Sequence, residues 1–162
     1  MLFRNLGADD QKQATQWSDL GFGAPTIIGF ANLCSQAMTS PAGSVTTSEN
    51  DLSDEAKAIL VATTNRGTID IRASRESFDS AARFLAVCVE YELDRRLLFL
   101  QKENPEQTIR FLEGFRQLCQ SGLVIHHLHK EFSLSVAGFD LAKTLKREDF
   151  EQQLGFATEI EH

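Results

Sequence analysis

Three histidines lie within four residues of this chain, and their type and spacing come closest to a metal site. They are His126, His127 and His129, and Cys119 precedes them by a few residues. Imidazole nitrogens and thiolates are ligands that Zn²⁺ accepts. No second cysteine or carboxylate stands at a familiar ligand spacing, however. We therefore interpret the three as ordinary strand histidines, and leave open that they bind a metal or titrate near neutral pH.

The motifs of catalysis and cofactor binding are each incomplete. Residues 21–26 (GFGAPT) begin like a dinucleotide fingerprint but lack its third glycine and carry a misplaced proline. Residues 41–45 (PAGSV) lack the glycine that must follow in a nucleophile elbow. Glu90, Glu92 and Asp94 alternate, but no partner residue sets one as acid and another as base. We therefore expect no enzyme, no cofactor and no small-molecule substrate.

The charge of the chain is divided unevenly along its length. The chain has 162 residues, 42% of them apolar and 24% charged, and a net charge of −7, which suits a globular protein with one domain and tails. Residues 1–65 hold 3 basic and 7 acidic side chains, residues 66–147 hold 13 and 11, and residues 148–162 hold none and 5. The middle is therefore mildly basic, yet its acidic residues are too well mixed to predict a basic patch.

The cysteines and the apolar runs bear on location. Cys34, Cys88 and Cys119 are odd in number and widely spaced, which indicates a reducing, cytoplasmic setting. Residues 20–34 are fairly apolar, but glycine, proline and asparagine interrupt them. That run is too short and too broken to predict a membrane span.

Residues 1–51 have the composition of a flexible N-terminal arm. Residues 39–50 (TSPAGSVTTSEN) show no apolar periodicity, and we expect residues 35–50 to be mobile. The apolar residues 26–30 leave open that part of the arm docks on the body of the protein.

A helix and a strand are expected at the start of a domain that we place at residues 52–146. Ser53 is suited to cap the helix, because acidic residues follow it and apolar residues then recur at helical spacing. Residues 68–72 alternate with a period of two, as a half-buried strand does.

The element that follows this strand is harder to assign. We expect a second helix to restart at Ser74 or Ser77 and to reach about Glu92, although residues 87–93 alternate as a strand would. The apolar run 97–100 is too short to distinguish helix from strand.

The clearest start signal in the chain precedes residues 105–121, where we predict a helix. Asn104 suits the N-cap, Pro105 suits the first helical position, and Gln107 stands where a capping-box partner belongs. Gly122 is expected to end the helix.

The residues after this helix predict a hairpin and a further helix. Residues 124–129 and 132–135 can pair as strands around Lys130-Glu131, and helical spacing returns from Gly138. The residues Gly122, Leu123, Val124, Phe132, Leu134, Ser135, Gly138, Leu141, Ala142 and Leu145 resemble the pattern of the winged-helix family. The expected elements follow one another as helix, strand, helix, helix, hairpin, helix, and this order also resembles the family, so we expect a winged-helix-like α+β fold.

The same resemblance implies that residues 105–121 are a recognition helix. Its outward face and the wing would offer Gln107, Arg110, Arg116, Gln117 and Lys130, and arginine and glutamine are side chains that read base edges. Glu113 lies within that face and the wing has one lysine, so the face has few contacts for phosphate. Our leading hypothesis is therefore a non-enzymatic interaction module, regulatory or adaptor-like, that binds a protein partner or itself. The alternative is a DNA-binding transcriptional regulator.

Residues 147–162 are expected to form an acidic C-terminal helix or tail. Phe150 and Leu154 lie four residues apart on one helical face, and Phe156 extends it. A second copy of the chain or this chain's own arm would cover such a strip. The predicted core of the domain consists of Ile59, Ile69, Ile71, Phe78, Leu85, Ile109, Leu112, Phe115, Leu123, Phe132, Leu134 and Leu141.

Overall fold

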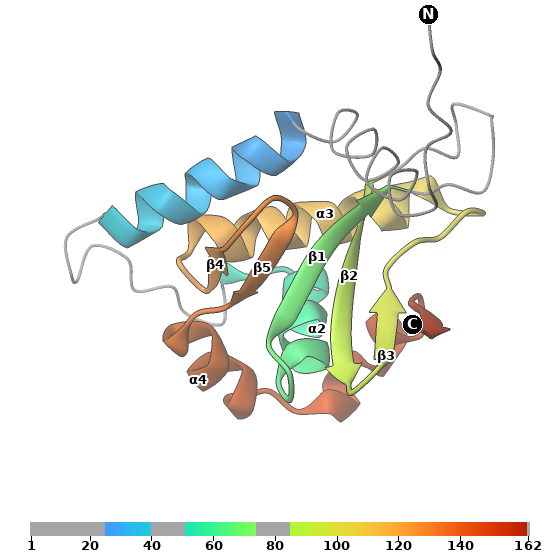
Figure 1. Cartoon of the computed structure of the whole chain (residues 1–162). Coiled ribbons are helices and arrows are strands. Elements are labelled where there is room, and N and C mark those ends of the chain that lie inside the picture. The colour runs from blue at the N-terminus through green and yellow to red at the C-terminus, as the bar shows by residue number, and fades with distance from the viewer. Residues whose placement is uncertain (1–24, 40–50, 74–84, 162) are drawn as a thin grey trace, which may run out of the picture.

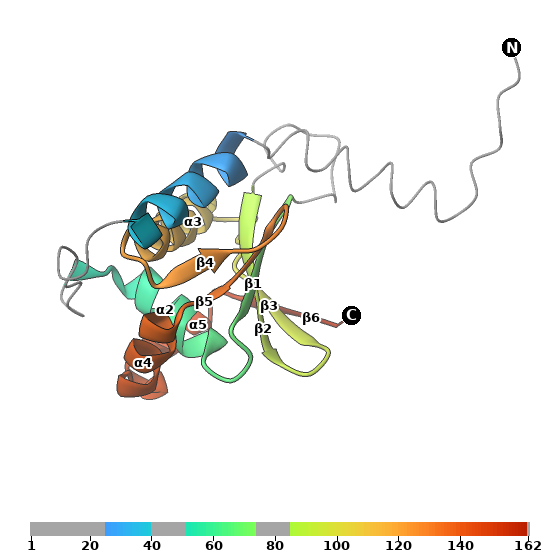
Figure 2. The ribbon, with the colours of Figure 1, turned by 60° about the vertical axis from the view of Figure 1, so that its left-hand side comes forward.

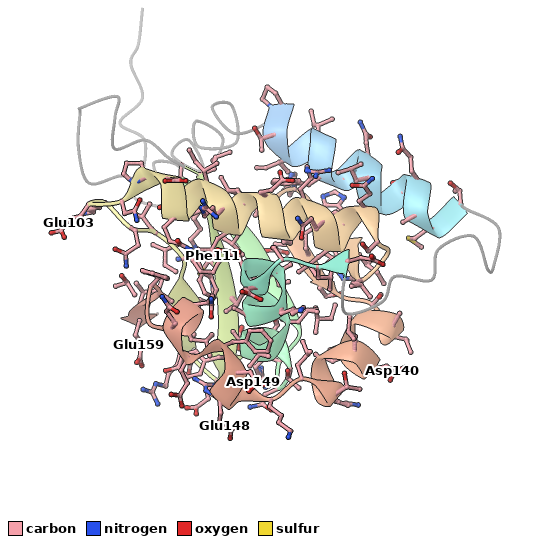
Figure 3. The ribbon with its side chains drawn as sticks, turned by 180° about the vertical axis from the view of Figure 1, so that it is seen from behind. Glu103, Phe111, Asp140, Glu148, Asp149 and Glu159 are labelled. Atoms are coloured by element: carbon pink, nitrogen blue, oxygen red, sulfur yellow. The ribbon has the colours of Figure 1, made fainter. Side chains whose placement is uncertain are left out.

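The protein is a two-layer arrangement of helices on one face of an antiparallel sheet (Figure 1). The computed structural model describes residues 25–39, 51–73 and 85–161. An α+β fold is therefore confirmed. Figure 3 shows the layer of helices from behind, with Phe111 near its middle and with Glu148 and Asp149 at its rim.

The sheet has six described strands in the order β4-β5-β1-β2-β3-β6, and all neighbours are antiparallel. The strands are β1 (Thr68–Ala73), β2 (Leu85–Glu92), β3 (Arg95–Leu98), β4 (Val124–His126), β5 (Glu131–Leu134) and β6 (Thr158–Glu161). Two hairpins, β2-β3 and β4-β5, lie on either side of β1 along the sheet, and β6 adds to the outer side of β3. The sheet therefore ends at β4 on one side and at β6 on the other.

The two central helices begin where the sequence predicts. In α2 (Asp54–Thr63) the Ser53 side chain accepts a hydrogen bond from the backbone N–H of Ala56. In α3 (Pro105–Gln120) the Asn104 side chain caps the first turn. Gly122 follows α3 with φ +73°, a conformation that glycine adopts without strain. The capping predictions are confirmed.

A close crossing of α2 and α3 forms the centre of the helical layer. A Cβ at Gly114 would lie 2.7 Å from the backbone nitrogen of Ala56, so only glycine allows this approach. Beneath the crossing, buried aromatic rings pack in pairs, with centroids 4.4 Å apart for Phe99 and Phe111. Such pairs contribute beyond the area that they bury.

The helix at residues 25–39 packs on this layer and belongs to the core. Ile27, Phe30 and Cys34 are buried at helical spacing, and the rings of Phe30 and Phe115 meet edge to face at 5.0 Å. Figure 2 shows this helix lying over α3 and β4. The docking that the sequence left open for residues 26–30 is therefore found. Of the segment expected to be mobile, residues 35–39 are helical, and residues 40–50 lie outside the described residues.

The C-terminal segment also joins the fold beyond the predicted domain limit of residue 146. It follows α4 (Val136–Thr144) as a short 3₁₀ helix η3 (Arg147–Phe150), α5 (Glu151–Leu154) and β6. Phe150 is buried in the chain's own core, and Leu154 and Phe156 pack partly buried against it. The sequence left open whether a second copy or the N-terminal arm covers these three residues, and the structure packs them on the core of the same chain.

One predicted helix is wrong over the residues that can be compared. Residues 85–92 form β2, residues 95–98 form β3, and residues 74–84 lie outside the described part. The reason is that β2 is a central strand whose neighbouring residues are buried on both faces, from Ala86 to Val89. A strand that is buried on both sides reads as a continuous apolar run, like a buried helix segment.

The predicted core is largely confirmed, with exceptions on α3. Ile109 is 50% exposed, while Phe111 and Leu118 are fully buried, so the buried face of α3 is rotated from the predicted one. Leu85, Leu112 and Leu141 are partly buried against the core, and Phe78 lies outside the described residues. The rotation follows from the position of α2, which meets α3 at Gly114.

Candidate functional site

The face of the sheet that points away from α2 and α3 carries a ladder of polar side chains. In Figure 1 these helices lie behind β1 and β2. The strand registers place Glu131, Asp70, Cys88, Leu98 and Thr158 side by side across five strands. This row and its neighbours form what we term the open sheet face.

Ion pairs fix the side chains of the open sheet face. The Asp70 carboxylate accepts a hydrogen bond from Arg72 Nε at 3.0 Å and lies 3.7 Å from Arg96 Nη1. Arg66 Nε donates to Glu90 at 3.1 Å at the rim. The Arg96 Nε atom is itself buried and makes no hydrogen bond. Each carboxylate in these pairs is thus engaged, while one guanidinium donor faces no acceptor.

A shallow hollow of about 50 Å³ lies in this face. Its lining consists of Thr68, Asp70, Cys88, Glu90, Arg96 and Glu131. Pockets that enclose a small organic substrate usually hold about 300–1,000 Å³. The hollow therefore suits a contact with a single side chain of a partner better than a substrate molecule.

Cys88 in the hollow is not a nucleophile at neutral pH. Burial raises the pKa of its thiol to about 12, and the negative charge of Asp70 acts in the same direction. A thiolate is the reactive form of cysteine, and it is scarce far below the pKa. The open sheet face therefore offers hydrogen bonds and charges, with no activated thiol.

Two residues of the predicted recognition face are turned to α2 instead. Gln107 Nε2 donates to a Glu55 carboxylate oxygen at 3.3 Å, and Gln117 Oε1 accepts from the backbone N–H of Ser53 at 2.9 Å. Both side chains are half-buried and contact α2 or its N-cap residue, so they face solvent only in part, and their role in binding a partner stays a prediction. The periodicity of α3 could not reveal this, because the position of α2 decides it.

The two arginines of that face are exposed, but acidic neighbours on α3 compensate their charges. Arg110 binds Glu106 at 2.9 Å, and Arg116 forms a hydrogen-bonded pair with Glu113. These carboxylates raise the pKa of each arginine, and Arg116 lowers the pKa of Glu113. Binding to phosphate would have to break both pairs, so this face is a poor match for a DNA backbone.

The β4-β5 hairpin holds the remaining predicted residues. The main-chain carbonyl of Lys130 accepts from Ile71 N–H at 3.2 Å, so its segment continues the sheet beside β1. His126 Nε2 lies 2.8 Å from the carbonyl oxygen of His129, and His127 Nε2 lies 2.7 Å from Ser133 Oγ. Within the described ranges, no three histidine, cysteine or acidic side chains gather to hold a metal ion.

A second surface feature is the outer edge of β6, which the sequence reading missed. The Glu159 carboxylate accepts hydrogen bonds from Tyr91 Oη at 2.7 Å and from Arg95 Nε at 2.7 Å. These contacts span β2, β3 and β6 and fix the strand at the end of the sheet. The β-branched residues Thr158 and Ile160, which alternate with glutamates, were a sequence signal for this strand.

Comparisons with known proteins found no match. No family model matches the chain, and no curated protein or solved structure matches it. In the part of the chain that the structure describes, no helix has the length and apolar character needed to cross a membrane. The geometry therefore has to carry the functional argument.

Proposed function

We propose that this chain is a non-enzymatic interaction module, regulatory or adaptor-like, that binds an extended segment of another protein along the edge of β6. The single observation that supports it is the position of β6 at the end of the sheet. The outer row of backbone N–H and C=O groups on such a strand finds no partner among the described strands. An extended polypeptide can pair with an edge of this kind and prolong the sheet.

The negative charge of the C-terminal segment that contains β6 favours one kind of partner. Residues 148–162 hold five acidic and no basic side chains. Two copies that paired through β6 would bring two such segments together, whereas a partner strand with lysine or arginine would be attracted. We therefore infer a basic, alternating strand of a second protein as the occupant, in preference to a homodimer through this edge.

A winged-helix relation is retained as a proposal for one part of the chain only. The order α3, β4-β5 hairpin, α4 supports it, as does Ser135, whose side chain caps α4 after the hairpin. The pairing of β1 with β5 is a further supporting observation. In this proposal α3, the β4-β5 hairpin and α4 serve as a scaffold and not as a DNA-binding surface. The reason is that the side chains of Gln107 and Gln117 make hydrogen bonds to α2 and its N-cap residue.

Selection from a random-peptide library tests the proposed function. We expect selected peptides to alternate apolar with basic residues and to bind the full chain with dissociation constants on the order of micromolar. In an added antiparallel strand, N–H groups of alternate residues point to the sheet edge. Two methylated peptides are compared, one N-methylated at the odd-numbered residues and one at the even-numbered residues. The peptide whose methyl groups point to the sheet edge should lose binding, and the other should keep it.

An equal loss of binding by both methylated peptides would contradict strand addition. Two further measurements distinguish the alternatives. Sedimentation equilibrium over a wide concentration range would reveal a homodimer. A salt-dependent shift of random duplex DNA, lost on Arg110→Ala with Arg116→Ala, would favour the DNA-binding regulator and overturn the proposal.

A further inference from the structure

The helix at residues 25–39 and α3 run side by side in the same direction, and two contacts fix their register (Figure 1). Near one end, the rings of Phe30 and Phe115 meet at 5.0 Å. Near the other, the Cβ of Ala37 lies 3.5 Å from the position that a Cβ on Gly122 would occupy. In both pairs the later residue follows its partner by the same number of residues (the same offset) along the chain. The two helices therefore stay in register between the pairs.

Cys34 and Cys119 share this offset and lie between the two contacts. Both side chains are almost fully buried, with 1% and 0% of their surface exposed, and both are free thiols. The register alone therefore brings the two sulfur atoms together at the interface. A hydrogen bond between the two thiols agrees with this placement.

The two thiols differ in chemical character. The hydrogen bond from Cys119 lowers the pKa of Cys34, and the backbone at His126 acts in the same direction. Burial raises the pKa of Cys119, followed by the effect of its neighbour Cys34. Cys34 is therefore the thiol that ionises first and attacks, and Cys119 is the resolving thiol.

We propose that Cys34 and Cys119 form a dithiol modification site that a low-molecular-weight disulfide, such as oxidised glutathione, converts to a disulfide clamping the 25–39 helix onto α3. The proposal concerns the β4 end of the sheet, so it stands independently of peptide binding at β6.

The reaction consists of two thiol–disulfide exchanges. The Cys34 thiolate attacks one sulfur of oxidised glutathione, forming a mixed disulfide and releasing one glutathione thiolate. The Cys119 thiolate then attacks the Cys34 sulfur of the mixed disulfide, and the second glutathione leaves. The protein loses two protons and two electrons, and one molecule of oxidised glutathione becomes two of the thiol.

Access to the buried pair requires a local opening of the 25–39 helix. Ile27, Phe30, Leu33 and Cys34 of this helix pack on the core, and Ala37 lies against Gly122. A single peripheral helix of this kind opens at a lower free energy than the sheet does. The disulfide would stop this opening, because it joins the helix covalently to α3.

The test is to incubate the folded full chain with oxidised glutathione and to map the product by mass spectrometry after alkylation. We expect a species lighter by two hydrogen atoms, with residues 34 and 119 in one linked peptide and Cys88 alkylated after unfolding. The melting temperature should rise by about 5–10 °C and return on addition of dithiothreitol. Amide exchange in residues 25–39 should slow.

Variants separate the two steps. Cys119→Ser should stop at the mixed disulfide on Cys34, whereas the matched control Cys88→Ala should form the 34–119 link as the wild type does. A stable mixed disulfide in the wild type would overturn the proposal, as would a link to Cys88. The absence of a link in folded protein, under conditions that oxidise the urea-unfolded chain, would also overturn it.

Discussion

The two ends of the sheet are protected in different ways. At the β4 end, the 25–39 helix lies alongside the strand and buries Phe30 and Cys34 against the core. At the β6 end, no further described strand pairs with β6, and its Glu159 carboxylate is fixed by Tyr91 and Arg95. A cover excludes every incoming strand, whereas charge excludes only strands of the same sign. Under the proposed function, selective binding therefore belongs to β6.

The strongest test of this contrast places one methyl group at each end. Gly138→Ala adds a Cβ 2.1 Å from the Leu123 carbonyl oxygen, which leads into β4. Because that oxygen belongs to the backbone, we expect a loss of about 3 kcal/mol in the free energy of unfolding. The control Gly155→Ala, before β6, meets oxygens only at 3.3 Å and should change stability little. Urea unfolding measures both, and equal losses would refute the contrast.

The second test removes the cover at the β4 end. Phe30→Ala deletes the ring that packs edge to face on Phe115. We expect the free energy of unfolding to fall by about 2 kcal/mol, because the loss cannot exceed the free energy with which this one helix docks. Amide exchange should become faster in residues 25–39 and in β4. Ile28→Ala is the control, because Ile28 is 57% exposed on the same helix. If β4 amides stayed as protected as before, the helix would not be the cover.

A third test examines the centre of the sheet, between the two ends. Asp70→Asn removes the negative charge that helps to raise the pKa of Cys88, so that pKa should fall below its value of about 12. The loss of a partner for Arg72 and Arg96 acts in the same direction. Thiolate absorbance as a function of pH reports the change. Glu131→Gln, across the same hollow, is the matched control, and a fall as large in that variant would show that Asp70 has no special role.

The smallest effect is expected at β6. The hydrogen bond from Tyr91, followed by that from Arg95, lowers the pKa of Glu159. These contacts therefore stabilise the fold above the pKa that Glu159 has in the unfolded chain, and the contribution disappears as the pH falls through the folded value. Glu159→Gln should lower the melting temperature slightly near neutral pH, and the difference should vanish in acid and shrink in salt. Glu148→Gln serves as the control, and a difference that grew in acid would contradict the assignment.

The sequence indicated local structure well where a physical signal was strong. The capping residues Ser53 and Asn104 and the stop at Gly122 set the limits of α2 and α3, and the alternation in 68–72 gave β1. These signals are local, since each depends on a hydrogen bond or a backbone angle within a few residues. By contrast, β2 was misread because its buried residues 86–89 form a short apolar run that fits a helix as well as a strand, and the alternation in residues 87–93 was not followed.

What the sequence by itself determined was the α+β class, part of the core and the starts of the two central helices. Tertiary structure alone decided which way α3 faces, since Gly114 meets Ala56 and turns Gln107 and Gln117 toward α2. It also brought β6 beside β3 and Cys34 beside Cys119, pairs that lie far apart along the chain. The physical reason is that periodicity fixes the angle between residues on one element, but only packing against other elements fixes which side is buried.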